Sequence, residues 1–443
     1  MRRTRIATLA TAAAVAAGVG GFLAVSSPDA QAATTSRIPT HVFAPYFEAY
    51  NGDSLNGLSQ QSGNNFLTIA FAQTASVGSC TALWDGDTAI SSANYGSDIA
   101  AIRARGGDVI PSYGGYAADN SGTELADSCS NVNSIAADFE KMITTYDVTR
   151  IDLDVEDNSL GRSDGIDRRN KAIAQVESWA AANGRLIQFS YTLPTSPNGL
   201  ESNALAILSN AKQNNARIDI VNIMTFDYYD GATHDMAAAT QTAATGLFNQ
   251  LKQVWPGKTD AQYWNMVGVI EMNGEDDYAN DSGNLNAENF TLANATTVTN
   301  WAKSKGIGAL SFWALQRDNG GCAGQAPGDR NCSGVSQSTW QFSHLMQGFT
   351  SGSSSTTPPT TPPTTQPTTP PTTKPTTPPT TKPTTPPTTK PTTPPAGTTW
   401  APNTAYKAGQ VVTYAGRSYK CLQSHTSLVG WEPPNVPALW QAL

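Results

Sequence analysis

The sequence predicts an α/β fold: a (β/α)8 TIM barrel, then a Pro/Thr-rich linker, then a small all-β module. Three observations lead to this prediction. Short apolar segments alternate with amphipathic helical patterns up to about residue 350, a tract made almost only of proline and threonine follows, and the chain ends in a segment rich in tryptophan and tyrosine. At 443 residues the chain is too long for one small domain. We therefore expect four segments: 1–32, 33–350, 351–398 and 399–443.

Residues 1–32 have the pattern of a cleaved secretory signal peptide. Arg2, Arg3 and Arg5 precede an apolar stretch of mainly Ala, Gly and Val, and Ala30-Gln31-Ala32 matches an A-x-A cleavage site. A membrane anchor is the alternative, since the stretch is nearly long enough to span a bilayer, but Ala and Gly are only weakly apolar. The adjacent Arg2 and Arg3 also permit twin-arginine export, so the export route stays open. We expect a secreted, extracellular protein with no membrane contact after signal removal.

Eight short apolar segments between residues 33 and 350 are predicted strands. They alternate with helical patterns, of which Val132–Tyr146 and Arg168–Ala182 are examples. Eight strand-helix units fit a (β/α)8 barrel. A doubly wound open sheet is the competing arrangement, but the first strand runs into Glu48-Ala49-Tyr50 rather than a glycine-rich phosphate loop. The predicted strands are His41–Phe47, Phe66–Gln73, Asp108–Tyr113, Arg150–Glu156, Leu186–Leu193, Ile218–Phe226, Met266–Met272 and Ile307–Trp313.

The charge is unevenly distributed along the chain. Only 14% of the residues are charged and the net charge is −8, but residues 33–350 hold 18 basic and 33 acidic side chains, which gives −15 for the predicted barrel. An acidic domain of this kind does not favour nucleic acid as a partner, because such binding needs an excess of lysine and arginine on some face. We expect a partner that is neutral or faintly cationic.

Residues 351–398 are predicted to be a spacer. An eight-residue repeat, Thr-Thr-Lys-Pro-Thr-Thr-Pro-Pro, places Lys374, Lys382 and Lys390. A tract of proline and threonine cannot bury a core and favours extended polyproline II, at about 3.1 Å per residue. Its threonines are candidate glycosylation sites.

Five cysteines in an exported chain indicate disulfides. Cys322 and Cys332 flank one loop, Cys80 and Cys129 form the natural second pair, and Cys421 is left over. The cysteines have no Cys-x-x-Cys spacing and the four histidines are scattered, so we expect no metal site and no cofactor.

The segment Arg150-Ile151-Asp152-Leu153-Asp154-Val155-Glu156 carries the sharpest functional pattern. On a strand its acids point to one side and its apolar residues to the other. In a barrel the acidic side faces the interior, where burial and like charges raise at least one carboxyl pKa. Glu156 is nearest the C-terminal mouth, where barrel active sites lie, and is the predicted proton donor. A solvated acidic edge and a calcium or magnesium site are the alternatives; the apolar alternation disfavours the first, and the second normally uses a flexible loop.

Several motifs, in chain order, resemble glycoside hydrolase family 18, the chitinase family. Asp152-Leu153-Asp154-Val155-Glu156 resembles its Asp-x-Asp-x-Glu core, and Ser112-Tyr113-Gly114-Gly115 its Ser-x-Gly-Gly motif. Met224-Thr225-Phe226-Asp227 resembles its Met-x-Tyr-Asp motif, and Trp313 the tryptophan that ends the eighth strand. The resemblance covers roughly residues 38–348. It implies a catalytic barrel over residues 33–350.

The resemblance implies a retaining mechanism in which the substrate acetamide is the nucleophile. Glu156 would protonate the glycosidic oxygen, Asp154 would orient the acetamide, and Asp152 would hold or share the proton of Asp154. Asp227 would contact the acetamide from the sixth strand, and Trp313 would form the floor under the −1 sugar. Met224 and Tyr46 are further expected substrate-binding residues.

The chain departs from the family pattern at two places. Thr149-Arg150 stands where the family motif usually begins with Asp-Gly, so the outermost acid is missing. Phe226 stands where most members have a tyrosine whose hydroxyl touches the acetamide. Tyr228 or Tyr191 is expected to supply that hydroxyl, and the sequence does not decide between them.

Residues 399–443 resemble the chitin-binding modules of carbohydrate-binding families 5 and 12. The matching segments are Ala405-Tyr406-Lys407-Ala408-Gly409, Tyr419-Lys420-Cys421 and the run from Gly430 to Trp440. Strand-like pieces over 410–414 and 417–422, joined at Ala415-Gly416, predict a hairpin. The resemblance implies that Trp431 stacks on the sugar with Thr426, Glu432, Pro433 and Pro437 beside it, while Trp400, Tyr406 and Trp440 form the core.

Together the resemblances imply a chitinase acting on chitin and N-acetylglucosamine oligosaccharides. The short connection from Met272 to Ile307 leaves no room for the α+β insertion of deep-cleft members, which implies an open cleft and endo-type cleavage. An endo-β-N-acetylglucosaminidase on N-glycans is one alternative; a non-catalytic chitin-binding lectin is another, although such lectins typically lack the terminal glutamate. Cellulose is a third candidate substrate. We expect a monomer.

Overall fold

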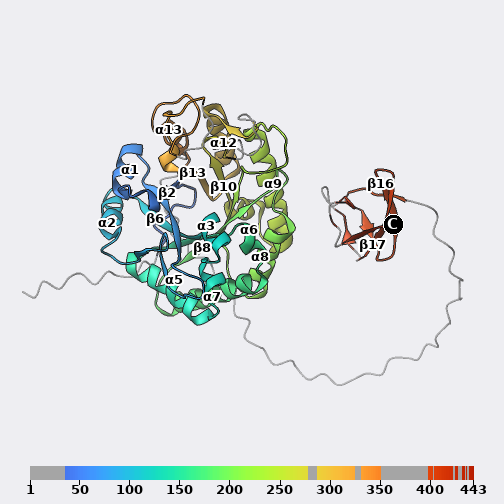
Figure 1. Cartoon of the computed structure of the whole chain (residues 1–443), viewed down its shortest axis with the longest axis horizontal. Helices are drawn as coiled ribbons and strands as arrows, with labels where there is room; N and C mark the ends of the chain where they lie inside the picture. Colours follow the sequence, from blue (N-terminus) through green and yellow to red (C-terminus); the bar gives the residue numbers. More distant parts are fainter. Residues whose placement is uncertain are drawn as a thin grey trace, which may run out of the picture.

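The computed structural model describes residues 35–277, 287–324, 331–350 and 398–443, the last range without 403, 423–424, 428–431, 435 and 437–438. The predicted signal peptide and residues 351–397 of the predicted linker lie outside the described residues. The barrel and the C-terminal module are therefore described separately, with element labels as in Figure 1.

Eight parallel strands close into a barrel, and the first of them is split into β1 (Val42–Phe43) and β2 (Tyr46–Glu48). β1 pairs with β13 (Ala309–Trp313) and β2 with β3 (Phe66–Thr74), so the split strand joins both ends of the sheet. The split falls at Ala44-Pro45, where proline has no N–H to donate. From β13 back to β3 the barrel continues through β10 (Val267–Met272), β9 (Ile220–Met224), β8 (Gln188–Pro194), β7 (Arg150–Asp154) and β6 (Asp108–Gly114). The predicted strands and their barrel arrangement are thus confirmed.

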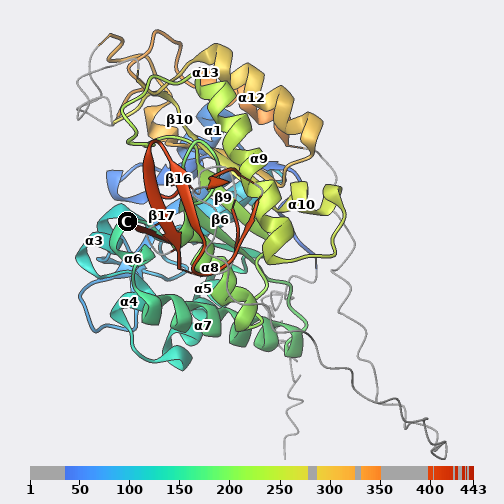
Figure 2. The same cartoon turned by 90° about the vertical axis from the view of Figure 1, so that its right-hand side faces the viewer.

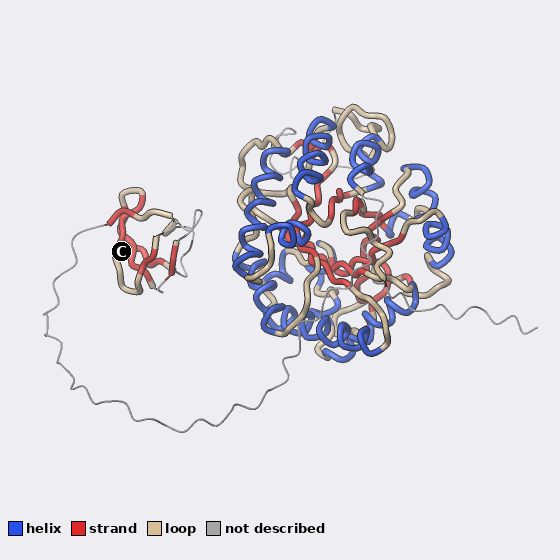
Figure 3. The backbone as a smooth tube through the Cα atoms, turned by 180° about the vertical axis from the view of Figure 1, so that it is seen from behind, coloured by secondary structure: helices blue, strands red, loops and turns tan. Residues whose placement is uncertain are grey.

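Helices surround the ring of strands, as Figure 3 shows. Their amphipathic faces cover the outside of the barrel and bury its main core against the strands. Figure 2 shows α9 and α12 running side by side on this outer layer. The helices are α1 (Leu55–Ser62), α2 (Gly96–Ala104), α3 (Tyr116–Ser121), α4 (Leu125–Ser128), α5 (Val132–Tyr146), α6 (Asp157–Leu160), α7 (Ser163–Ala182), α8 (Ser202–Gln213), α9 (Met236–Val254), α10 (Asp260–Met266), α12 (Leu292–Lys305) and α13 (Gln341–Met346), with 3-10 turns at Ala49–Asn51, Leu315–Arg317 and Gln347–Phe349.

Helix α5 has the bounds that the sequence predicts, but α7 begins at Ser163 instead of Arg168. Its first turn is polar, so the apolar spacing does not reveal it. Asp164 in this turn favours helix formation, because an acid stabilises the positive end of the helix dipole. At Gly165 a Cβ atom would meet the carboxylate of Asp127, which would have to move.

The barrel interior is layered from bottom to top. A small apolar cluster that includes Val42, Phe66 and Ile110 closes the N-terminal end. Buried polar side chains, among them Ser190 and Asn222, fill the middle. The C-terminal end holds a second apolar cluster: Tyr46, Ala70, Met224, Phe226, Ile270, Met272 and Ala314, with Phe71 and Trp313 packed against it. The C-terminal end of the barrel, where active sites of this fold lie, thus rests on a packed and polar base.

Short strands extend the barrel's connections. β4 (Ala82–Trp84) and β5 (Thr88–Ala89) add antiparallel strands to β3. β11 (Gly274–Glu275) pairs with β12 (Asn289–Phe290) in the connection after β10. Besides α12, the described part of that connection holds only this two-stranded pair, consistent with the absence of a large inserted domain.

Two disulfides join the predicted pairs, Cys80 with Cys129 and Cys322 with Cys332. Cys421 belongs to neither and is buried in the module. Within the described parts of the chain, no helix is both long and apolar enough to cross a bilayer.

The C-terminal module is a small all-β unit, as predicted. Its central hairpin joins β16 (Val411–Tyr414) to β17 (Arg417–Cys421) through Ala415 and Gly416, whose φ angles of 47° and 77° fit a tight two-residue turn. The remaining strands are β14 (Thr398–Thr399), β15 (Ala405–Tyr406), β18 (His425–Thr426) and β19 (Trp440–Ala442). Its core consists of Trp400, Tyr406, Val412, Tyr419, Cys421 and Trp440, which includes the three aromatic residues that we expected there.

Candidate active site

A pocket of about 280 Å³ opens at the C-terminal end of the barrel. Asp154 and Glu156 lie in its wall, and Trp313 and Met224 come from other strands. The lining residues are Tyr46, Phe71, Tyr116, Asp154, Glu156, Thr192, Met224, Phe226, Asp227, Tyr229, Ile270, Met272, Asp277 and Trp313. The pocket therefore gathers seven residues of the sequence-based hypothesis: Asp154, Glu156, Asp227, Met224, Trp313, Tyr46 and Phe226.

Strand β7 positions the carboxylates by simple alternation. Ile151, Leu153 and Val155 are buried in the outer core, so Asp152 and Asp154 face the barrel interior. Glu156 lies two residues beyond the end of β7 and is partly exposed. The acids thus form a row that runs up to the pocket.

Asp152 lies beneath the pocket in a dense hydrogen-bond network. Its carboxylate accepts bonds from Ser112 Oγ at 2.7 Å, Ser190 Oγ at 2.6 Å and Tyr46 OH at 3.0 Å. Thr192 and Asn222 donate further bonds from β8 and β9. Burial raises the pKa of Asp152, while these donors oppose the shift because they favour the ionised form. Asp152 is therefore a fixed anchor for the row.

Asp154 and Glu156 both hold their protons more strongly than ordinary carboxyl groups. Burial, followed by the charges of Glu156 and Asp152, raises the pKa of Asp154 well above its usual range. Burial and the charge of Asp157 raise the pKa of Glu156 to about 7. A carboxylic acid protonated near neutral pH and open to a pocket can act as a general acid.

Three aromatic side chains form the floor of the pocket. The Trp313 ring stacks on Phe71 with 5.5 Å between centroids and 11° between planes, and Tyr46 packs against both. A flat apolar floor suits the apolar face of a pyranose ring.

The Ser-x-Gly-Gly segment has both a polar and a steric role. Ser112 bonds to Asp152. Gly114 (φ 100°) and Gly115 (φ 82°) adopt backbone angles that favour glycine. A Cβ atom on Gly114 would collide with the backbone oxygen of Asp154, and one on Gly115 would lie 2.6 Å from the Phe71 ring. The glycines allow β7 and the aromatic floor to approach the loop after β6.

Asp227 belongs to a cluster of carboxylates that sequence reasoning missed. Oxygens of Asp227, Asp276 and Asp277 lie within 4.8 Å of one another. Burial and the two neighbouring acids raise the pKa of Asp227 to about 11. The buried guanidinium of Arg317 interacts electrostatically with Asp276 and Asp277. It is a positively charged side chain beside this carboxylate cluster. Asp276 and Asp277 could have been predicted from their position just after the seventh strand, which ends at the barrel mouth.

Neither tyrosine proposed to replace the hydroxyl missing at Phe226 lines the pocket. Tyr191 donates its hydroxyl to Asn170 on α7 at 2.7 Å, because β8 alternation points it to the outer core. Tyr228 is buried against His234, with ring centroids 5.1 Å apart. The pocket is lined instead by Tyr229, whose hydroxyl hydrogen-bonds with Asp227. Asp227 and Tyr229 have φ angles of 52° and 51°, a chain path that residue spacing does not predict.

The module's expected contact residues are only partly described. Trp431 and Pro437 lie outside the described residues, as does the side chain of Thr426. Glu432 is partly exposed. Pro433 is buried, and its expected place beside the sugar stays a prediction.

Two family models match the chain: Glycosyl hydrolases family 18 over residues 42–273, and Carbohydrate-binding module family 5/12 over residues 399–441. The chain is 30% identical over 324 residues to the probable bifunctional chitinase/lysozyme of Escherichia coli (strain K12), covering 70% of this chain and 35% of that protein. It is 30% identical over 292 residues to Endochitinase 11 of Metarhizium anisopliae, covering 63% and 53%. The chain thus spans about half or less of the length of these curated relatives.

A solved structure resembles the barrel. The active domain 2 of the chitinase from Pyrococcus furiosus, solved as catalytic-site mutants, aligns with a TM-score of 0.61 and 28% identity over 71% of this chain and 97% of that one. Combined with the match over residues 42–273 and the acidic row on β7, this places the catalytic barrel. The chain belongs to glycosyl hydrolase family 18 and carries a carbohydrate-binding module of family 5/12.

Proposed function

We propose that this protein is a secreted, endo-acting chitinase that hydrolyses β-1,4-linked N-acetylglucosamine polymers by a retaining, substrate-assisted mechanism. One observation carries the proposal. Glu156, whose pKa is about 7, follows the buried Asp154 on one strand end, in a pocket floored by Trp313. That arrangement supports the assignment of a proton donor and an acetamide partner to one sugar site.

In the first step Glu156 donates its proton to the glycosidic oxygen, and the bond from that oxygen to the anomeric carbon breaks. The acetamide oxygen of the −1 sugar attacks the same carbon and forms an oxazolinium ion. Water then opens the ring at the anomeric carbon and gives its proton to the Glu156 carboxylate. The two displacements together retain the configuration at that carbon.

Asp154 stabilises this sequence by accepting a hydrogen bond from the acetamide N–H as positive charge develops. Transfer of the Asp154 proton to Asp152 would leave Asp154 as the anionic carboxylate that accepts this bond, while the Asp152 carboxylate becomes neutral. Asp227, protonated at neutral pH because its pKa is about 11, is suited to donate a hydrogen bond to the acetamide oxygen.

Glu156→Gln tests the proposal. The substitution keeps the size and polarity of the side chain but removes the acidic proton, so turnover of N-acetylglucosamine oligomers should fall by at least about a hundredfold. Circular dichroism and the melting temperature should stay close to those of the wild-type protein. Turnover retained at the wild-type rate would refute the assignment.

Endo-type cleavage is supported by the short connection after β10, whose described residues form a β-pair and a helix. Early digestion of soluble chitin should yield a range of oligosaccharide lengths. Disaccharide as the sole early product would contradict it.

Substrate class can be tested by incubating the protein with chitin, cellulose and an N-glycosylated protein and identifying the products. Release of chito-oligosaccharides alone would support a chitinase.

Secretion is supported by the pattern of residues 1–32 and by the two disulfides, which persist in oxidising compartments. Recovery of the mature chain from the culture medium, with its N-terminus just after Ala32, would test it.

A further inference from the structure

The backbone N–H of Glu156 needs a partner from outside the barrel sheet. Val155, the residue before, still donates its N–H to Thr192 on β8. β6 ends at Gly114, and the last bond between the two strand ends is that from Gly115 N–H to the Asp154 carbonyl. The Glu156 N–H instead donates to the carboxylate of Asp119, a fully buried residue of α3. A buried N–H without a partner is costly, so Asp119 determines where this residue sits.

Helix α3 contacts Glu156 in the opposite direction as well. The N–H of Tyr116, the first residue of α3, donates to the Glu156 carboxylate. Each partner therefore supplies one donor and one acceptor to the other. This reciprocal pair fixes both the backbone and the side chain of the proton donor.

The two residues after Glu156 are held by the neighbour of Asp119. Asn120 Nδ2 donates to Asp157 Oδ2 at 2.9 Å, and Asn158 Nδ2 donates to Asn120 Oδ1 at 2.9 Å. Asp157 has a φ of 37°, in the left-handed region where side chains other than glycine are strained. Asn120 therefore holds the chain in a turn that it would not adopt by itself.

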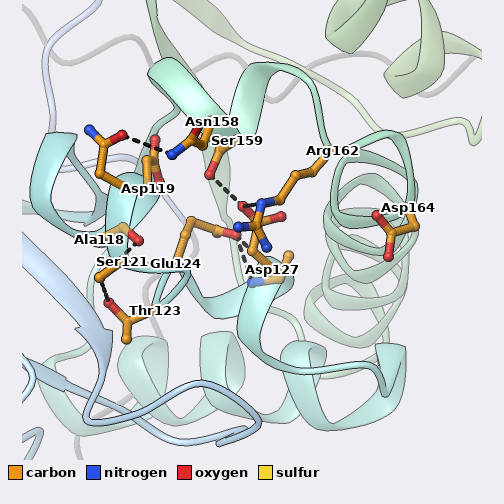
Figure 4. Close-up of polar contacts among 12 residues, drawn as sticks. Ala118, Asp119, Ser121, Thr123, Glu124, Asp127, Asn158, Ser159, Arg162 and Asp164 are labelled. Carbon is orange, nitrogen blue, oxygen red and sulfur yellow. Dashed lines mark hydrogen bonds and ion pairs between the residues drawn. The ribbon is translucent and has the colours of Figure 1, made fainter.

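A second set of contacts holds the segment that follows α3, and Figure 4 shows those of Asp127 with Ser159 and Arg162. Asp127 accepts a hydrogen bond from Ser159 on α6 and lies 3.6 Å from Arg162 Nε. Glu124 pairs with the buried Arg169 of α7 at 2.7 Å and accepts the N–H groups of Ala126 and Asp127. The segment that follows α3 is thus fixed to α6 and α7, the two helices that follow Glu156.

We infer that Asp119 is a positioning residue for the proton donor and that Asp119 and Asn120 together form a clamp on residues 156–158. The inference rests on the proposed function of Glu156 as general acid. Its chemical consequence is specific, because a displaced acid slows the bond-cleavage step most where the leaving group needs a proton. Binding of the sugar, which depends on the pocket walls, is unaffected.

The test uses the full chain with Asp119→Ala, Asp119→Asn and Asn120→Ala. Ser121→Ala is the matched control, since Ser121 lies on α3 but bonds to Ala117, Ala118 and Thr123 rather than to residues 156–158. Each variant is assayed on chitotetraose, whose leaving sugar hydroxyl needs a proton, and on 4-methylumbelliferyl chitobioside, whose phenolate departs with little protonation.

Asp119→Ala is expected to lower kcat for chitotetraose by at least about tenfold with KM unchanged, and kcat for the aryl glycoside by less than about threefold. Asp119→Asn keeps an acceptor oxygen and should recover most of the lost rate. Asn120→Ala should show a smaller loss with the same substrate preference, and Ser121→Ala should match the wild-type protein.

Equal losses on both substrates would overturn the inference, as would an Asp119→Asn variant as slow as Asp119→Ala. If Asp119→Ala does not fold, Asn120→Ala decides the question, because Asn120 is exposed and its replacement leaves the core intact. A wild-type chain inactive on both substrates would refute the proposed function. If the wild-type chain is active and the Asp119 and Asn120 variants match its rate, the clamp is refuted while the proposed function stands.

Discussion

Glu156 lines the pocket and is partly protonated at neutral pH, so the pH dependence of kcat should report its titration. Its pKa is raised to about 7 by burial and then by the negative charge of Asp157. A general acid works in its protonated form, so kcat should be level about one pH unit or more below pH 7 and fall about tenfold per pH unit well above it. Asp157→Asn removes a negative charge and should move this alkaline limb to lower pH. Measuring kcat for chitotetraose between pH 5 and 9 checks both; a limb unmoved by the substitution would contradict the assigned cause.

Tyr229 and Tyr228 offer a matched pair of substitutions in one loop. The Tyr229 hydroxyl bonds to Asp227 in the pocket, so Tyr229→Phe should raise KM for chito-oligosaccharides severalfold, in line with the loss of about one hydrogen bond. The Tyr228 hydroxyl is buried and has no hydrogen-bond partner among the described residues, so Tyr228→Phe should leave the kinetics unchanged. Equal effects of the two substitutions on KM would refute the placement of Tyr229 at the sugar site.

At the scale of single elements, the strands were predictable because each depends on a local pattern. The alternation of acids and apolar residues over residues 150–156 is enough to place Asp152 and Asp154 inside the barrel. The donors that surround Asp152 were not predictable, because Ser190, Thr192 and Asn222 become its neighbours only when β7, β8 and β9 pair in register. Asp119 escaped notice for the same reason, since an acid on a short loop helix has no periodic pattern that marks it.

The two disulfides should differ in their contribution to the stability of the barrel. Cys80–Cys129 joins residues 49 apart and ties the loop after β3 to the end of α4, whereas Cys322–Cys332 joins residues 10 apart. In the chain-entropy model, closing the longer loop stabilises the fold by about 4 kcal/mol and closing the shorter one by about 3 kcal/mol. Calorimetry of the two paired Cys→Ser variants should therefore show the larger fall in the free energy of unfolding for Cys80/Cys129. The reverse order would contradict this account.

At the scale of the whole chain, cleavage and attachment to the substrate belong to separate parts of the sequence. The barrel has a buried acidic row and an aromatic floor, and the module has its own compact aromatic core. That core uses Trp400, Tyr406 and Trp440, and Trp431, the module's third tryptophan, is the predicted sugar contact. A flat aromatic ring on an exposed face stacks on neutral sugar rings without any need for charge.

Trp431→Ala in the full chain tests this division of roles. Adsorption to insoluble chitin should fall by about tenfold or more, since one large aromatic contact in a small interface contributes about 1–3 kcal/mol. Hydrolysis of insoluble chitin should slow with it, because fewer barrels stay near the surface. The kcat and KM for chitotetraose should not change, because a dissolved substrate reaches the barrel without the module, and this serves as the internal control. Unchanged adsorption would exclude Trp431 as the main contact, and a parallel fall in soluble activity would mean that the module acts on the barrel rather than on the surface.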